Sequence, residues 1–262
     1  VSNNLKQIGL ALHNYHDTHL TFPSGWIAVD AATGVHSAAD GVNGAGWGTM
    51  ILPHLDQTNL YAQFDSHLAI EHPANTIFLD GRPAVFRCPS DPQPDTFDIN
   101  DEASGLTVLA TLPVANYLGS FGTDELDGCA NMAGTAPVSA TGQCKGDGIF
   151  FHNSTTRIRD VTDGTSNTFV VGERVTRVAE GWHSTWVGMV SKGEEAFQRI
   201  LGSADHVPND RAAHFDDFSS QHTGGAQFCL ADGSVHFLSE NIDLSVYRSL
   251  ATRAGGELVS EF

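Results

Sequence analysis

The sequence predicts an α+β protein, with one helix at the start, a long run of short strands and a closing helix. Three observations lead to this prediction. Apolar residues recur at three- and four-residue steps at the beginning of the chain. From about residue 84 onward, short apolar runs are separated by Gly and Pro. These runs do not alternate with regular helical segments, so a parallel α/β sheet is not expected.

The first helix is expected over residues 2–19. Its apolar face contains Leu5, Ile8 and Leu12, and polar residues fall on the remaining surface. Ser2 could cap the start of the helix through its hydroxyl. The helix should end in the segment TFPSGW, because Pro and Gly break helices.

A loop, a divided helical region and seven strands are expected next. Residues 28–46 are rich in Ala, Gly and Asp without periodicity, which is typical of a loop. Residues 46–65 have a helical pattern that Pro53 kinks or splits. The expected strands are AVFRCPSDP (84–92), VANYLGSFG (114–122), DGIFFHNS (147–154), Thr168 to Val171, STWVGMVS (184–191), AQFCL (226–230) and VHFLS (235–239).

The last two strands are expected to form a hairpin, and a helix should follow it. Asp232-Gly233 between the two strands favours a type I′ turn, in which both central residues have positive φ. Residues 243–257 are expected to form the closing helix. Asp243 is its expected N-cap, and Gly255 is the expected glycine just after its end.

The charge of the chain limits its partners. It holds 13 Lys and Arg against 31 Asp and Glu, a formal net charge of −18 at pH 7. Because the basic residues are few and scattered, we expect no nucleic-acid partner and no binding to an anionic membrane surface. No apolar run approaches the roughly 20 residues of a membrane span. The chain opens on Val1 inside an amphipathic stretch, so we expect an upstream segment that this sequence does not include.

The four cysteines indicate one disulfide and leave one pair open. Cys129 and Cys144 bracket a loop rich in Gly, Ala, Thr and Ser, which a disulfide would stabilise by roughly 3 kcal/mol. We expect this bridge, and with it an oxidising, extracytoplasmic compartment. Cys88 and Cys229 either form a second bridge or are buried free thiols. No Cys-x-x-Cys pair occurs, so a structural zinc site is not expected.

Six blocks of the sequence resemble a large bacterial family of prepilin-like proteins. They are NNLKQIGLALHNYHDTHLTFPSGW, WGTMILPHLDQTNLY, FRCPSDP, NYLGSFG, RIRDVTDGTSNTFVVGE and FSSQHTGGAQFCLADGSVHFLSENID. Members of this family carry a type IV pilin-type cleavage and methylation signal at the N-terminus. They end in an H-X9-DG domain, a pattern that His222 and Asp232-Gly233 match here. The resemblance covers nearly the whole chain in the expected order.

The resemblance implies a pilin-like fold, in which a long N-terminal helix packs on an antiparallel β-sheet with long loop insertions. Residues 1–262 would then form a single globular domain. Within it, residues 1–22 would be the C-terminal half of the N-terminal helix and residues 23–262 the sheet-and-loop head, while the upstream membrane helix is absent from this chain. The family often has a cysteine before the NNLKQ block, where this chain has Val1. A disulfide that uses this cysteine cannot form here, which leaves the pairing of Cys88 open.

The strongest candidate for metal binding is the segment DVTDGTSNT with the Glu downstream of it. Its side-chain oxygens alternate around a Gly turn, as in sites for the hard cation Ca²⁺. The resemblance adds to this, because major pseudopilins often bind calcium in loops. The expected ligands are Asp160, Asp163, Thr165, Asn167 and Glu173. An Asp-Gly turn with local capping bonds uses the same residue types and is the alternative.

Two histidine-containing groups are further candidates. His13, His16 and His19 could share a metal, but steps of three residues spread them around a helix, and they would also suit its C-terminal dipole. His222 and Asp232, with Ser219 or Ser234, supply the residue types of a hydrolase. No nucleophile elbow occurs, so an enzyme is not expected.

Acidic and aromatic side chains give weaker candidates. Asp91 and the segment 217–222 offer isolated carboxylates. The four tryptophans, Trp26, Trp47, Trp182 and Trp186, could stack on sugar rings. Trp182 lies beside a turn and is the better candidate, whereas Trp47 is expected in the core.

Two functions from different classes fit these expectations. The first is a non-enzymatic pilin-like or pseudopilin-like subunit of the cell envelope or of a surface filament. Its expected location is extracytoplasmic or extracellular, anchored through the missing N-terminal helix, with other pilin-like subunits or envelope components as partners. The second is an extracellular, calcium-dependent module for adhesion or for binding a ligand or polysaccharide.

Overall fold

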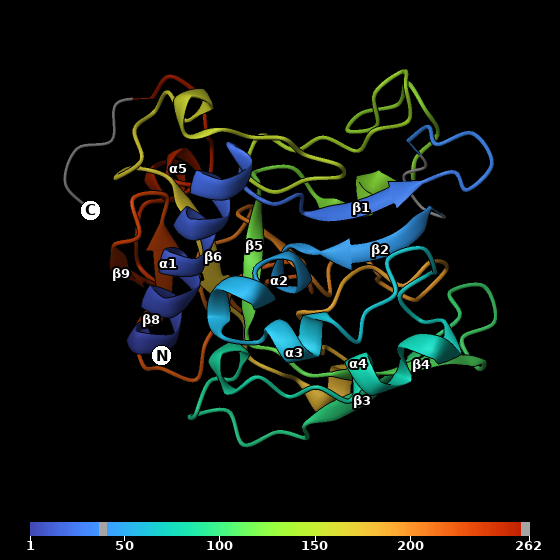
Figure 1. The fold of residues 1–262 in the computed structure, drawn as a ribbon. Coiled ribbons are helices and arrows are strands. Elements are labelled where there is room, and N and C mark those ends of the chain that lie inside the picture. Colours follow the sequence, from blue (N-terminus) through green and yellow to red (C-terminus); the bar gives the residue numbers. More distant parts are fainter. Residues whose placement is uncertain (37–40, 258–262) are drawn as a thin grey trace.

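The N-terminal helix lies across the last β-hairpin of the chain (Figure 1). The structure is a computed structural model that describes residues 1–36 and 41–257. Helix α1 (Ser2–His19) has the predicted bounds. Its apolar face, Leu5, Ile8 and Leu12, is buried as predicted. The helix packs on the hairpin of strands β8 (Gly225–Leu230) and β9 (Val235–Ser239).

The start of α1 corrects one prediction. Val1 is the N-cap residue, and no side chain caps the helix. Ser2 is already the first helical residue, so it does not occupy the position from which a hydroxyl caps a helix. At the other end, Leu20 adopts a left-handed conformation and its N–H donates to the carbonyl of His16.

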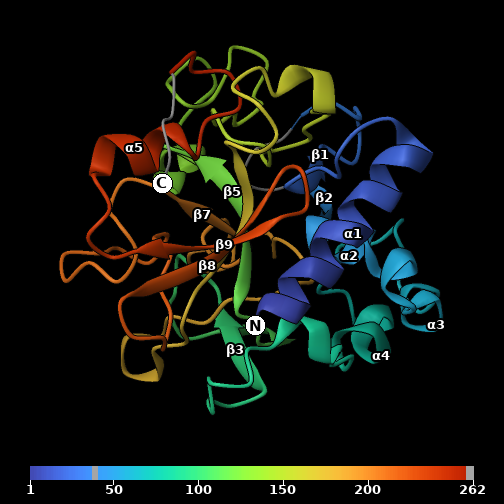
Figure 2. The same cartoon turned by 90° about the vertical axis from the view of Figure 1, so that its left-hand side faces the viewer.

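A five-stranded sheet lies at the centre, in the order β7-β5-β6-β8-β9 (Figures 1 and 2). The strands not yet defined are β5 (Tyr117–Gly122), β6 (Phe169–Glu173) and β7 (Leu201–Ser203). Strand β7 pairs parallel to β5, and the other neighbours pair antiparallel. The α+β class is therefore confirmed with a mixed sheet. The N-terminal helix of this chain has 18 residues.

Both faces of the central sheet are covered. Because side chains alternate along a strand, Tyr117 and Cys229 join the core beneath α1, whereas their neighbours Leu118 and Phe228 join a second core. Tyr247 of helix α5 (Leu244–Ser249) belongs to that second core. Figure 2 accordingly shows α1 and α5 on opposite sides of the sheet.

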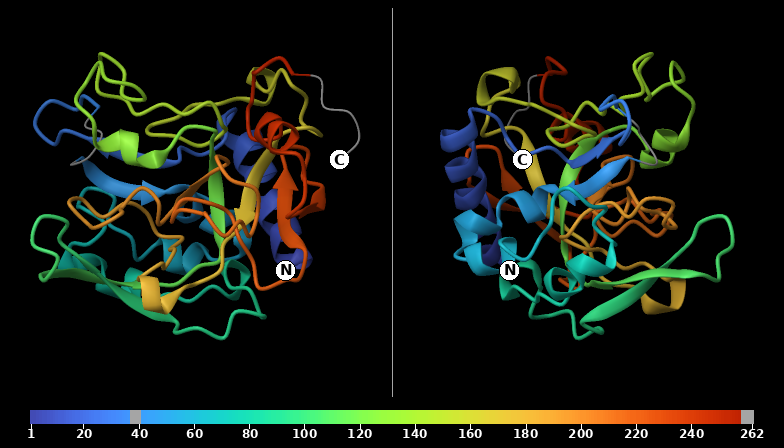
Figure 3. Two further views of the ribbon diagram at one scale, coloured as in Figure 1. Left: turned by 180° about the vertical axis from the view of Figure 1, so that it is seen from behind. Right: turned by 45° about the vertical axis from the view of Figure 1, so that its right-hand side comes forward.

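Two small sheets and several short helices complete the fold (Figure 3). Strand β1 (Trp26–Val29) pairs with β2 (Val42–Gly46), and β3 (Thr96–Asn100) pairs with β4 (Val108–Pro113). The remaining α-helices of the described chain are α2 (Trp47–Met50), α3 (Thr58–Tyr61) and α4 (Thr76–Leu79). A 3-10 turn at Leu52–Leu55 separates α2 from α3, so the predicted split at Pro53 is confirmed. No helix in the part of the chain that the structure describes is long and apolar enough to cross a membrane.

Several strands differ from the prediction. The predicted loop at 28–46 contains β2, although residues 37–40 of it lie outside the described residues. Residues 84–86 form a 3-10 turn, and residues 147–154 and 184–191 make only isolated bridges. These last two segments are apolar because they are buried, but their amides bond to several different neighbours. The N–H of Thr185 donates to the carbonyl of Arg199, for example, whereas that of Met189 donates to Gly44.

The hairpin β8–β9 is confirmed, but its turn is not type I′. Gly233 has a φ of 84°, whereas Asp232 is not among the residues with positive φ. The N–H of Gly233 donates to the carbonyl of Leu230, which makes Ala231 and Asp232 the central residues of the tight turn. Gly233 follows in the left-handed conformation, as in a three-residue hairpin loop with a G1 bulge.

The closing helix is shorter than predicted. Asp243 accepts the N–H groups of Ser245 and Val246, which confirms its role as the N-cap. Helix α5 ends at Ser249, so Gly255 is not the glycine that ends it. The N–H of Gly255 instead donates to the carboxylate of Asp163, because the chain turns back along the 160–167 segment after the helix.

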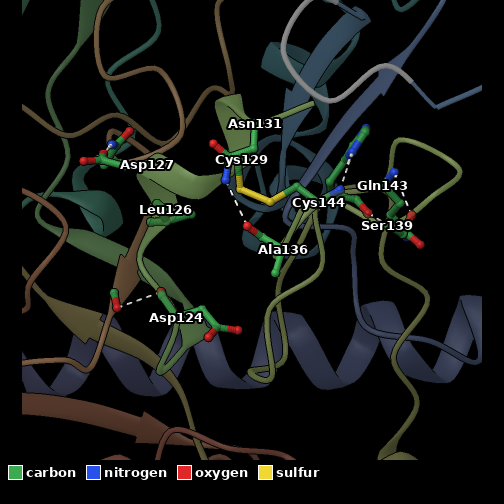
Figure 4. Close-up of a disulfide and its surroundings, with 12 residues drawn as sticks. Asp124, Leu126, Asp127, Cys129, Asn131, Ala136, Ser139, Gln143 and Cys144 are labelled. Carbon is green, nitrogen blue, oxygen red and sulfur yellow. Dashed lines mark hydrogen bonds between the residues drawn. A yellow bond between two sulfur atoms is a disulfide. The ribbon is translucent and has the colours of Figure 1, made fainter. Parts of the chain in front are cut away.

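The predicted disulfide is present (Figure 4). Cys129 and Cys144 are bonded to each other and fully buried. Inside the loop that they close, the side-chain amide of Asn131 donates to the carbonyl of Ala136. Cys88 and Cys229 are buried free thiols, which decides between the two alternatives for this pair.

Candidate functional site

Two aspartates and two histidines converge just after β7. They are Asp205, His206, His214 and Asp217, and we call them the His–Asp cluster. The ligand atoms that they offer all lie within 4.8 Å of one another. A loop brings them together: after β7 the chain runs through residues 204–216 and returns so that Asp217 lies beside Ser203 in a parallel bridge.

Asp217 organises this loop. Its side chain is 1 % exposed, and its carboxylate accepts the backbone N–H groups of His206 (3.3 Å) and His214 (2.6 Å). The same carboxylate lies 3.1 Å from Nδ1 of His206. The carboxylate of Asp205 lies 3.2 Å from Nδ1 of His206 and 3.6 Å from Nδ1 of His214. The two imidazoles thus face two carboxylates from a loop that is fixed by its own backbone.

The pKa values of the two carboxyl groups in this cluster are shifted by burial and by their neighbours. Burial is the largest cause that raises the pKa of Asp217 to about 9, and the adjacent Asp205 carboxyl adds to it. Burial alone would raise the pKa of Asp205 as well. The hydrogen bond with Asp217 and the nearby histidines outweigh burial there and lower that pKa. Two carboxylates this close repel each other when both are ionised, so the cluster favours a shared proton or a bound cation.

A cavity of about 330 Å³ adjoins the cluster. His214 lines it and is 57 % exposed, so the cluster is accessible from this side. Trp182 and Phe215 form an aromatic part of the wall, with their rings stacked 5.8 Å apart. Four carboxyl side chains also line the cavity: Glu125, Asp127, Glu195 and Asp216.

A second group joins the end of β6 to the segment before β8. Its members are Cys88, Glu173 and His222. Nε2 of His222 lies 3.4 Å from Oε1 of Glu173 and 4.0 Å from Sγ of Cys88. Burial raises the pKa of both the Glu173 carboxyl and the Cys88 thiol. This group therefore contains a protonatable carboxyl in contact with an imidazole.

The residues predicted to bind calcium are not gathered into one set. The carboxylate of Asp163 accepts the N–H groups of Gly255 and Gly256 and the hydroxyl of Thr252. Asp160 accepts the N–H of Arg157 in a local capping box. These are capping bonds of the kind that the alternative interpretation of this segment predicts.

The other members of the predicted calcium set also have other partners. The carbonyl of Thr165 accepts the N–H of Asp232, and the Asn167 amide donates to the carbonyl of Asp163. Glu173 lies at the last position of β6, with His222. Among the described residues, the His–Asp cluster and the Cys88 group are the sets of three or more such side chains that converge. Asp160 and Asp163 belong to neither set, and Glu173 belongs to the Cys88 group, away from these two carboxylates.

The remaining histidine candidates also separate. Nε2 of His16 accepts the N–H of Ile158, whereas His19 stacks on Tyr15 with the ring centroids 4.0 Å apart. His13 instead packs edge-on against Phe22. The three rings thus make packing and capping contacts around the end of α1, as the alternative to a shared metal predicts.

The hydrolase residues do not come together either. Asp232 accepts the N–H of Ser234 within its own turn, and His222 contacts Glu173. The hydroxyl of Ser219 accepts the N–H of Val175. Asp91, the other isolated carboxylate candidate, is buried and bonded to Asn116.

Trp47 is buried in the core, as predicted. Trp26 and Trp186 are buried as well, so the prediction that they could stack on sugar rings is wrong. Trp182 keeps part of its surface exposed and lies beneath the Arg177 guanidinium, 4.9 Å from the ring centroid.

The sequence does not predict the His–Asp cluster, although Asp217 is among the weaker carboxylate candidates. Its four residues occur in the sequence as Asp-His, then seven other residues, His, two other residues and Asp, over positions 205–217. No standard metal motif has this spacing, and only the return of the loop beside β7 brings the four side chains together.

The fold and these groups define an α+β protein with helices on both faces of a mixed sheet, a disulfide-closed loop and a convergent His–Asp cluster. The chain belongs to a bacterial family of unknown function: the family model described as "Protein of unknown function (DUF1559)" matches residues 1–245. No curated protein and no solved structure matches the chain.

Proposed function

We propose that this protein is a non-enzymatic pilin-like or pseudopilin-like subunit of the cell envelope or of a surface filament. The observation that supports this most is the packing of α1 on the β8–β9 hairpin. Leu5, Ile8 and Leu12 are buried against the body of the protein, whereas Leu10 on the outer face is 63 % exposed. A helix buried along one face and exposed along the other suits a subunit whose N-terminal helix also contacts neighbours.

In this proposal the chain is one pilin-like domain. Helix α1, within residues 1–22, is the C-terminal half of a longer helix, and residues 23–262 contain the outward-facing head. The anchor is a membrane helix upstream of this chain, and the partners are other pilin-like subunits or envelope components. The buried Cys129–Cys144 disulfide supports an extracytoplasmic location, because disulfides persist in oxidising compartments.

The test is to express the full precursor with an epitope tag in the head and to image the cell surface. We expect the tag in the envelope fraction, in filaments or in surface assemblies. We also expect these assemblies to be lost when Leu10 is replaced by Asp, because the charge lies on the outer face of α1. His67→Ala, a change at another exposed site, is the control. Dispersed monomers after processing would overturn the proposal.

One observation favours a second function, an extracellular module for binding a ligand or polysaccharide with the help of calcium. The cavity beside His214 combines the aromatic wall of Trp182 and Phe215 with several carboxylates. Aromatic rings stack on the apolar faces of sugars, and carboxylates bind hydroxyl groups and Ca²⁺. The test is a polysaccharide binding screen with and without Ca²⁺. Binding that Trp182→Ala abolishes would support this function, and equal binding by the variant would reject it.

A further inference from the structure

We propose that the His–Asp cluster binds one divalent transition-metal ion of the zinc class, and that this ion fastens the 204–217 loop to β7. The proposal goes beyond the envelope role, which does not require a metal. The first argument is the type of ligand. Two imidazole nitrogens and two carboxylate oxygens are the donors that zinc and related ions take in proteins.

The spacing of the ligand atoms is the second argument. Ligands bound about 2.1 Å from a tetrahedral ion lie roughly 3.4 Å from one another. Nδ1 of His206 lies 3.2 Å from the carboxylate of Asp205 and 3.1 Å from that of Asp217. Nδ1 of His214 lies 3.6 Å from the carboxylate of Asp205. All three distances are close to those between ligands that share one tetrahedral ion.

An unpaired polar atom of the cluster is the third argument. Oδ1 of Asp205 is buried without a hydrogen-bond partner among the described residues. Buried polar atoms are normally paired, so this oxygen can take a further partner such as a metal ion.

The backbone holds the first ligands in place. The N–H groups of His206 and His214 both donate to the carboxylate of Asp217, so three of the four ligands are fixed relative to one another. Hydrogen bonds that the ligand residues make with one another in this way orient metal ligands. Because four protein ligands complete a tetrahedral shell, we assign the ion a structural rather than a catalytic role. Calcium fits less well, since it takes six to eight oxygen ligands.

The test uses the full chain after treatment with a chelator. Calorimetric titration with ZnCl₂ measures the affinity, and native mass spectrometry measures the number of zinc ions bound per chain. We expect one zinc ion per chain and a higher Tm with zinc. His214→Ala is the main variant because this side chain is largely exposed, so its loss should not prevent folding. It should weaken zinc binding at least tenfold and remove the rise in Tm. Asp205→Asn should do the same.

Two controls address other histidines. His67→Ala removes an exposed imidazole that lies 3.2 Å from Asp65, a His–Asp pair without the other two ligands. His222→Ala removes the imidazole of the Cys88 group. Both should bind zinc as the unmodified chain does. Unchanged zinc affinity in His214→Ala, loss of binding in His222→Ala instead, or no bound zinc at all would each overturn the proposal.

Substitution with Co²⁺ tests the geometry. A four-coordinate Co²⁺ site absorbs visible light strongly, whereas a six-coordinate site absorbs weakly. We expect strong bands that His214→Ala reduces and that added Zn²⁺ removes. Weak bands, or Ca²⁺ that competes with Zn²⁺ at equal concentration, would refute a tetrahedral site of the zinc class.

Discussion

Nε2 of His222 lies 3.4 Å from Oε1 of Glu173, so the histidine of the H-X9-DG pattern contacts β6 rather than the Asp-Gly turn. The other oxygen of Glu173 accepts the N–H of Gln227 at 2.7 Å. Together the two contacts tie the start of β8 to the end of β6. The carboxyl is 2 % exposed, and burial raises its pKa.

Loss of the imidazole should therefore destabilise the fold. His222→Ala leaves Oε1 of Glu173 buried without this partner, and we expect the free energy of unfolding to fall by about 1–3 kcal/mol. Urea unfolding at pH 7 measures it. His236→Ala removes an exposed histidine from the adjacent strand β9, and its effect should stay within about 0.5 kcal/mol. Equal losses in the two variants would show that the contact with Glu173 is not the cause.

His152 should make the protein sensitive to acid. Burial is the main cause that lowers its pKa to about 4, from an ordinary 6.5. Its Nδ1 accepts the N–H of Cys144, and Nε2 donates to the carbonyl of Ala28, so the ring is held neutral. A group whose folded pKa is depressed in this way protonates first in the unfolded chain. Its contribution to stability is thus complete above about pH 6.5 and is lost as the pH falls toward 4.

The expected loss from His152 alone is about 3 kcal/mol between these limits. The measurement is the free energy of unfolding from pH 8 to pH 4 for the unmodified chain and for His152→Gln. The variant should be less stable at pH 8, and the difference between the two proteins should shrink as the pH falls. A difference that stays constant over this range would contradict the assignment.

Asp163 should stabilise the chain without calcium. Its carboxylate accepts N–H groups from Gly255 and Gly256, which fastens the segment after α5 to the 160–167 turn. Asp163→Ala should lower the free energy of unfolding by about 1–3 kcal/mol in the presence of a chelator. Asp160→Ala, which removes only a local cap, should cost about 1 kcal/mol. Heat of Ca²⁺ binding that disappears in Asp163→Ala would instead support the calcium site predicted from the sequence.

The local features of this fold were predictable where short-range physics decides them. The helix over residues 2–19 has a clear period, and the hairpin around Asp232-Gly233 combines alternating strands with a turn sequence. Asp243 is a strong cap because its side chain can reach two N–H groups of the first turn. The Cys129–Cys144 bridge followed from a loop with little apolar surface to bury.

Features that depend on distant segments were not predictable in the same way. Residues 147–154 and 184–191 are as apolar as strands, but they are buried among many partners and form no ladder. The His–Asp cluster depends on a parallel bridge between Ser203 and Asp217, which no local pattern encodes. Glu173 was predicted to share a calcium ion with Asp160 because the two residues are close in sequence. The direction of β6 instead places the carboxyl of Glu173 beside His222.

Gly9 should determine how closely α1 packs on the hairpin. A Cβ at this position would lie 2.8 Å from Sγ of Cys229 and 3.3 Å from the Cα of Gly233. In an exposed helix the change from Gly to Ala stabilises by about 1 kcal/mol. Here we expect Gly9→Ala to destabilise by about 1–3 kcal/mol, because the methyl group overfills a buried contact.

The free thiol of Cys229 is the atom closest to the added methyl group, so Cys229→Ala should relieve part of this cost. The double variant should therefore be more stable than the sum of the two single changes indicates. A double-mutant cycle by urea unfolding measures this coupling. Additive effects would mean that α1 does not approach the hairpin as closely as the contact between Gly9 and Cys229 requires.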